Sequence, residues 1–153
     1  MFRKILVSMD GSRLAEQVLP YVAEQALRFG SEVVLLQVIG TSFPVAPVAP
    51  EIPVLVPVGP GQFRDEEQAR AYLERVGKSL QEKGLEVTFA TVLGRSAGEA
   101  IVSYARENEV DLIAMLTHGR SRLKRLVLGS VAEYVLRHSE LPILLIKPKT
   151  EDS

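Results

Sequence analysis

Residues 110–133 read VDLIAMLTHGRSRLKRLVLGSVAE, and the architecture of the whole chain follows from this stretch. The segment 110–116, which is apolar apart from Asp111, is typical of a strand buried on both faces of a sheet. Gly119 follows that run, and after nine further residues Gly129 and Ser130 open a segment with helical spacing. Glycine lets backbone N–H groups approach a ligand closely, and a helix start offers free N–H donors. The stretch therefore predicts a strand, a loop and a helix that together could meet a phosphate.

The rest of the chain repeats these two patterns in alternation. Apolar runs predict strands at 5–9, 33–39 (interrupted by Gln37) and 142–146. A further strand is predicted at 85–93, where apolar residues alternate with Glu86 and Thr88. Helical spacing of apolar residues lies between them, at 14–26, 65–83, 97–105 and 130–136. The order predicts an α/β fold: a doubly wound, five-stranded parallel sheet with helices on both faces.

Residues that favour helix ends support these boundaries. Ser12 is predicted to cap the first helix and Gly30 to end it. The segments 96–99 (SAGE) and 130–133 (SVAE) both fit the capping box, in which a serine caps a helix and a glutamate follows three residues later. Strict alternation over 85–93 predicts a strand with one face in water, at an edge of the sheet.

Composition limits the classes of function. The 153 residues suit one domain, predicted over 1–148 with a polar tail over 149–153. A net charge of −1 argues against a nucleic-acid partner. The absence of cysteine excludes thiolate chemistry, and two histidines are too few to suggest a transition-metal site. No apolar run approaches the ~20 residues of a membrane span, so we expect a soluble cytoplasmic protein without a membrane partner.

Six of the nine prolines lie in residues 40–63, which predicts an extended, non-helical loop insertion. The same segment is rich in valine. It either covers the domain's own core or serves as a lid or a docking segment for a protein partner, and both interpretations stay open.

These motifs, in this order, resemble the universal stress protein family over essentially the whole chain. The matching pieces are ILVSMDGS at 5–12, DLIAM at 111–115, THGRS at 117–121 and LGSVAE at 128–133. The resemblance implies strand order 3-2-1-4-5 and a homodimer. Many members bind ATP through the motif G-x-x-G-x(9)-G-[ST] and act as stress-responsive binding proteins rather than efficient enzymes, whereas others lack the motif.

The implied nucleotide site lies beyond the carboxyl ends of the first and fourth strands, where the strand order switches. The expected ligand is ATP, with Mg²⁺ carried in by it, and AMP and ADP are further candidates. No residue is predicted to be catalytic or to hold a metal by itself. The candidate binding residues are Ser8, Met9, Asp10, Val38, Met115, Leu116, His118, Gly119, Arg120, Arg122, Gly129, Ser130 and Val131.

Leu116 departs from the family motif, which places a glycine three residues before Gly119. Its side chain either narrows the pocket or points into the core and leaves the backbone in place. If it fills the pocket, the chain is a nucleotide-free dimeric interaction protein, which is the alternative function.

Other site residues also have two interpretations. Asp10 accepts hydrogen bonds from a ribose, helps to hold Mg²⁺ through water, or forms an Asx-turn before the first helix. Ser130 caps its own helix or binds a phosphate. Val38 and Met115 line a base pocket or belong to the core. The cluster Arg120, Arg122, Lys124 and Arg125 neutralises phosphates or is a solvated surface.

His118 is the candidate general base of a slow ATPase, although no Ser-His-Asp spacing accompanies it. We therefore expect a structural histidine there.

The final strand, Pro142, Ile143, Leu144, Leu145 and Ile146, is apolar throughout, which predicts that both its faces and its edge are covered. The same segment of a twin subunit or the chain's own helices would cover them.

Overall fold

A computed structural model describes residues 1–40, 66–118 and 128–149. The predicted loop insertion over 40–63 lies, apart from Gly40, outside the described residues, as do Gly119, Arg120 and Arg122. The elements, in chain order, are β1 (Lys4–Met9), the 3-10 segment η1 (Ala15–Val18), α1 (Leu19–Phe29), β2 (Glu32–Gly40), α2 (Glu66–Glu82), β3 (Val87–Gly94), α3 (Ala97–Glu107), β4 (Leu112–Leu116), α4 (Ser130–His138) and β5 (Ile143–Ile146).

The five strands form one parallel sheet in the order β3-β2-β1-β4-β5, which confirms the predicted fold class and strand order. β1 lies at the centre and pairs with β2 from Lys4–Glu32 to Met9–Gln37. On its other side β1 pairs with β4. Because the chain proceeds outward in opposite directions from β1 and β4, the connections diverge and leave a crevice beyond the carboxyl ends of these two strands.

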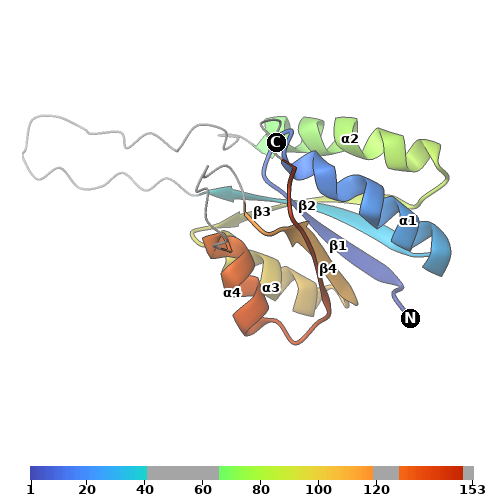
Figure 1. Ribbon diagram of the computed structural model, residues 1–153. Coiled ribbons are helices and arrows are strands. Elements are labelled where there is room, and N and C mark those ends of the chain that lie inside the picture. The colour runs from blue at the N-terminus through green and yellow to red at the C-terminus, as the bar shows by residue number, and fades with distance from the viewer. Residues whose placement is uncertain (41–65, 119–127, 150–153) are drawn as a thin grey trace, which may run out of the picture.

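The sheet divides the core into two layers. α1 and α2 cover one face of the sheet, and α3 and α4 cover the other (Figure 1). Alternate residues of β1 enter different layers: Ile5 and Val7 pack toward α1 and α2, and Leu6 packs toward α3 and α4. All three side chains are fully buried, as expected for a central parallel strand.

The first helical segment begins with a 3-10 turn, whereas the sequence predicts an α-helix. The Ser12 hydroxyl accepts a hydrogen bond from the Ala15 backbone N–H at 3.1 Å, but the turn that it caps is the 3-10 segment η1. The α-helix starts only at Leu19, with a proline in its first turn, where a missing N–H costs no hydrogen bond. Gly30 ends it in the left-handed conformation at φ 63°, as predicted.

β3 is an edge strand, as predicted, but the expectation of one wet face is wrong. Val87 and Phe89 pack against the first core layer, whereas Ala90 and Val92 pack against the second. The polar alternation of the sequence ends at Ala90, so the far half of the strand has apolar residues on both faces. Leu93, expected on the apolar face, is 69% exposed.

β5 forms the other edge of the sheet, paired with β4 from Ile113–Ile143 to Leu116–Ile146. Its four residues are partly exposed in the single chain, although they pack against both core layers. Beyond the strand, the Gln17 side-chain amide holds the Lys149 backbone through two hydrogen bonds, of 3.0 and 2.7 Å. These bonds fasten the chain after β5 to η1.

Candidate functional site

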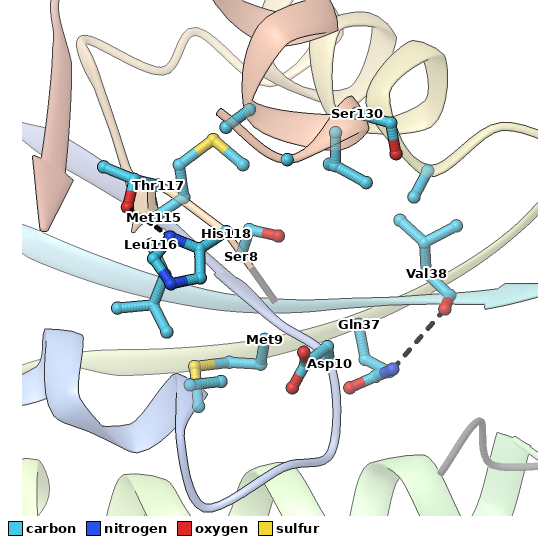
Figure 2. A pocket seen from close by; sticks show the side chains of 15 residues that line it. Ser8, Met9, Asp10, Gln37, Val38, Met115, Leu116, Thr117, His118 and Ser130 are labelled. Atoms are coloured by element: carbon cyan, nitrogen blue, oxygen red, sulfur yellow. Dashed lines mark hydrogen bonds between the residues drawn. The ribbon is translucent and has the colours of Figure 1, made fainter. Parts of the chain in front are cut away.

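A cavity of about 300 Å³ lies at the crevice between the carboxyl ends of β1 and β4. This volume falls at the lower end of the usual range for small-molecule sites. Figure 2 shows the α4 side of the cavity, with Ser130, across from Asp10 and Gln37. The cavity is lined by Ser8, Met9, Asp10, Ala15, Gln37, Val38, Ala97, Met115, Leu116, Thr117, His118, Gly129, Ser130, Val131 and Ala132.

The start of α4 forms one wall of this cavity. Gly129 is the N-cap residue, with φ −61° and ψ 156°, and no side chain among the described residues caps the helix. The first three residues of α4, Ser130, Val131 and Ala132, all line the cavity. Since the first N–H groups of any helix lack an intrahelical acceptor, this wall presents backbone donors and the positive end of the helix dipole.

The expectation that Ser130 caps its own helix is wrong. Ser130 is the first helical residue, one position too late for an N-cap. Glu133, its expected capping-box partner, instead forms an ion pair with Arg137 at 2.7 Å. The Ser130 hydroxyl is therefore not used by the helix end.

Gly129 is held close to the end of β4. Its N–H donates to the Thr117 carbonyl oxygen at 2.7 Å. A Cβ atom at this position would lie 3.1 Å from the His118 Cα, and a backbone atom cannot swing aside as a side-chain tip can. A glycine here brings the strand end and the helix start together, as the spacing of the motif predicts.

Leu116 does not block the cavity. Its side chain is 8% exposed and packs in the first core layer, on the sheet face covered by α1 and α2. The residue lines the cavity, but the open volume remains beside it. Of the two expectations for Leu116, the structure supports the side chain that enters the core.

Asp10 follows β1 and begins the turn into η1. Its Oδ1 atom accepts hydrogen bonds from the Ser12 backbone N–H, at 2.8 Å, and from the Ser12 hydroxyl. The Asx-turn interpretation is thereby confirmed. Asp10 nevertheless lines the cavity, so the turn fixes the carboxylate at the rim without removing it from the site.

His118 extends from the end of β4 beside Thr117. Its Nδ1 atom forms a hydrogen bond of 3.0 Å with the Thr117 hydroxyl. Within the part of the chain that the structure describes, no carboxylate contacts the ring, which leaves the histidine without the orienting acid of a catalytic triad.

Ten of the thirteen predicted site residues line the cavity, and the other three are those outside the described ranges. Val38 is partly buried against the second core layer, while Met9 and Met115 are nearly inaccessible. These three therefore belong to the core and to the cavity wall at once.

The sequence analysis missed five lining residues: Ala15, Gln37, Ala97, Thr117 and Ala132. The alanines gave no signal, because small apolar residues at helix starts are common. Gln37 did give one, since it interrupts an otherwise apolar strand. It is 2% exposed, and its Oε1 atom has no hydrogen-bond partner.

Two negative findings apply to residues 1–40, 66–118 and 128–149. No three acidic, histidine or cysteine side chains gather there in a way that could hold a metal ion. None of the helices in these ranges is both long and apolar enough to cross a membrane.

Comparison with known proteins places the chain. The model of the universal stress protein family matches residues 1–147. The chain belongs to the universal stress protein family. Universal stress protein MJ0577 of Methanocaldococcus jannaschii is 32% identical over 158 residues, covering 97% of each chain. Superposition on the solved structure of MJ0577 gives a TM-score of 0.75 at 29% identity, covering 99% of both chains.

Two universal stress proteins solved with nucleotides share the fold at lower identity. One, in complex with cAMP, is 18% identical with a TM-score of 0.69, covering 95% of this chain and 97% of that one. The other, from Archaeoglobus fulgidus in complex with dAMP, is 21% identical with a TM-score of 0.64, covering 95% and 98%.

Proposed function

We propose that this universal stress protein is a nucleotide-binding module of the stress response, with ATP as its ligand and ADP and AMP as further candidates. The observation that carries the proposal is the start of α4, which directs three backbone amides without a side-chain cap at the cavity. An anion is the group that such a helix end binds best. Two proteins of the same fold were solved in complex with cAMP and with dAMP, which supports a nucleotide phosphate as the anion.

The rest of the cavity suits the remaining parts of a nucleotide. Val38 and Met115, which both pack in the second core layer, provide an apolar wall for a base, and Asp10 provides an acceptor for a sugar. Leu116, the residue that favoured a nucleotide-free protein, packs into the core. We therefore favour the nucleotide-binding function.

A proline scan of the helix start tests this proposal directly. Ser130→Pro removes the first backbone N–H and the hydroxyl, and proline is well tolerated at the first position of a helix. The preceding Gly129 already has the extended ψ of 156° that a following proline requires. Ser130→Ala is the matched control, because it removes the hydroxyl alone.

We expect ATP affinity, measured by isothermal titration calorimetry, to fall about tenfold more in Ser130→Pro than in Ser130→Ala, the value of one charge-assisted hydrogen bond. Equal affinities in the two variants would show that the amide does not bind the phosphate. No binding by the native chain at millimolar ATP would refute the function itself.

We also propose that β5 pairs two copies of this chain into a homodimer. β5 is an edge strand whose four residues, Ile143–Ile146, are apolar yet partly exposed in the single chain. Exposed apolar edges favour pairing, and a twin copy gives a closed, symmetric contact. Light scattering should give twice the 16.8 kDa chain mass, and Leu145→Lys should shift the mass toward that of one chain.

A further inference from the structure

Tyr72 brings a hydroxyl into the buried face of α2, which is otherwise apolar. The side chain is 7% exposed and packs in the first core layer with Leu73 and Val76. Its hydroxyl donates a hydrogen bond of 3.1 Å to the carbonyl oxygen of Ser12, which lies 60 residues earlier in the chain. A phenylalanine would fill the same space, so what the hydroxyl adds is this contact rather than burial.

Ser12 connects this contact to the cavity. Its backbone N–H and its hydroxyl both donate to the Oδ1 atom of Asp10, and its hydroxyl accepts a hydrogen bond of 3.1 Å from the Ala15 N–H. Asp10 and Ala15 line the cavity, whereas Ser12 and Tyr72 do not. In Figure 2 the turn after Asp10 extends away from the cavity toward α2, at the bottom of the view. The Tyr72 hydroxyl therefore holds the far side of a turn whose near side carries a cavity carboxylate.

Arg75 joins α2 to the same segment a second time. Its guanidinium lies 5.4 Å from the centre of the Tyr72 ring and forms an ion pair of 2.9 Å with Glu16 of η1. Because the Arg75 side chain is mostly exposed, this ion pair contributes little by itself. The buried hydroxyl of Tyr72 is therefore the contact from α2 that is best placed to fix the turn.

We propose that Tyr72 is a positioning residue of the nucleotide site, which acts through Ser12 to hold the Asp10 carboxylate in the orientation that binds the ligand. This inference rests on the proposed function. Since Tyr72 lies outside the cavity lining, it does not bind the ligand itself. Its hydroxyl orders the turn before a ligand arrives, and a group that is already ordered binds more tightly because binding does not have to order it.

A double-mutant cycle separates this role from a general contribution to stability. ATP affinity is measured for the native chain, Tyr72→Phe, Asp10→Ala and the variant with both substitutions, by NMR titration, which can follow millimolar dissociation constants. Tyr72→Phe keeps the ring and removes only the hydroxyl. We expect it to lower ATP affinity about fivefold in the native chain, the value of one neutral hydrogen bond, and by less than about twofold when Asp10 is already alanine.

Tyr104→Phe is the matched control. It also removes a hydroxyl from a partly buried tyrosine, but Tyr104 lies in α3 and interacts with Lys4 and Glu32, the first residues of β1 and β2. These residues are at the opposite end of the sheet from the cavity. Tyr104→Phe should therefore leave ATP affinity unchanged within a factor of about two.

Hydrogen exchange of the Ser12 N–H gives a second readout, in the protein without ligand. This amide is bonded to Asp10. We expect it to exchange about fivefold faster in Tyr72→Phe than in the native chain, and at the native rate in Tyr104→Phe. A lower global stability alone would not change an amide that exchanges through local opening of a turn.

The outcomes distinguish this inference from the proposed function. An unchanged ATP affinity in Tyr72→Phe, or equal losses with and without Asp10→Ala, overturns the inference while the proposed function stands. Unchanged exchange of the Ser12 N–H in Tyr72→Phe does the same. If the native chain binds no ATP, the proposed function fails and this inference fails with it.

Discussion

The starts of α3 and α4 carry the same sequence pattern and form different structures. α3 follows Ser96, whose hydroxyl accepts a hydrogen bond from the Glu99 N–H at 3.4 Å, as the capping box predicts. α4 begins at Ser130 itself, and Gly129 occupies the N-cap position without a capping side chain. A shift of one residue thus separates a helix end closed by its own side chain from one that is open toward a cavity.

The comparison shows that one sequence pattern can cap a helix in one place and leave a helix uncapped beside a cavity in another. In both segments a serine precedes a glutamate by three residues. At α4, the hydrogen bond from Gly129 N–H to the Thr117 carbonyl, 2.7 Å, sets the glycine against the end of β4. Ser130 therefore becomes the first helical residue instead of the N-cap. The backbone N–H groups that an N-cap serine would have bound remain available to a ligand.

Gly129→Asp should abolish the difference and have the largest effect. An aspartate at the N-cap position would accept hydrogen bonds from the α4 amides, as Ser96 does at α3, and would repel a phosphate. We expect ATP affinity to fall by at least about a hundredfold, which is ~2.7 kcal/mol.

Gly129→Ala is its control in calorimetry, because both variants place a Cβ 3.1 Å from the His118 Cα and only aspartate adds an acceptor. If the alanine variant loses as much affinity as the aspartate variant, crowding rather than capping accounts for the effect.

Gly98→Ala should disturb the packing of the start of α3 against Tyr134 of α4. A Cβ on Gly98 would lie 2.7 Å from the Tyr134 Cβ, so that α3 and α4 must move apart. Overpacking of this kind costs about 1–3 kcal/mol of unfolding free energy. Urea denaturation measures the loss, and an unchanged midpoint would show that the helices yield freely.

Ser96→Ala and Ser130→Ala should separate the two serines by their effects on stability. Ser96→Ala removes a cap and should cost about 1 kcal/mol, lowering Tm by about 2–4 °C. Ser130→Ala removes no cap and should leave Tm within about 1 °C. Scanning calorimetry of the two variants gives both values, and equal losses would mean that Ser130 stabilises its helix after all.

His118→Ala should have the smallest effect, on chemistry. The ring of His118 is bonded to the Thr117 hydroxyl, and no described carboxylate orients it as a base. We expect any slow release of phosphate from ATP to proceed at the same rate within a factor of about two, since a general base contributes a hundredfold or more. A hundredfold loss of turnover with unchanged ATP affinity would instead identify His118 as a catalytic residue.

Much of the fold was predictable because parallel strands that are buried on both faces consist of nearly continuous apolar residues. Ile5, Leu6 and Val7 enter both core layers, and no other structure buries three consecutive side chains in this way as readily. The strand order came from the family resemblance, since the strand sequences by themselves do not specify their neighbours. β3 was misjudged because Ala90 and Val92 are apolar on the face that Glu86 and Thr88 suggested was polar.

The site was predictable where the backbone follows a motif and less so where a side chain acts alone. Gly129 was placed correctly, because a strand end and a helix start must approach each other there. Of the two interpretations of Ser130, the helix cap was wrong, because a sequence that fits the capping box need not place its serine at the N-cap position. Gln37 was noticed as an interruption of β2, but its unpaired Oε1 becomes apparent only when the neighbouring groups are placed around it.

Because Gly129 leaves the start of α4 without a capping side chain, ligand binding and the ordering of this helix end would be coupled. A helix whose first turn lacks an acceptor of its own frays more readily, and an anion that supplies acceptors tightens it. A bound nucleotide would serve as the missing N-cap residue, and Gly98 and Tyr134 would pass that tightening to α3 through their close contact. Amide hydrogen exchange at the first turn of α4 would then slow as the ligand concentration rises. The rigidity of this helix end would therefore depend on how much nucleotide the cell contains.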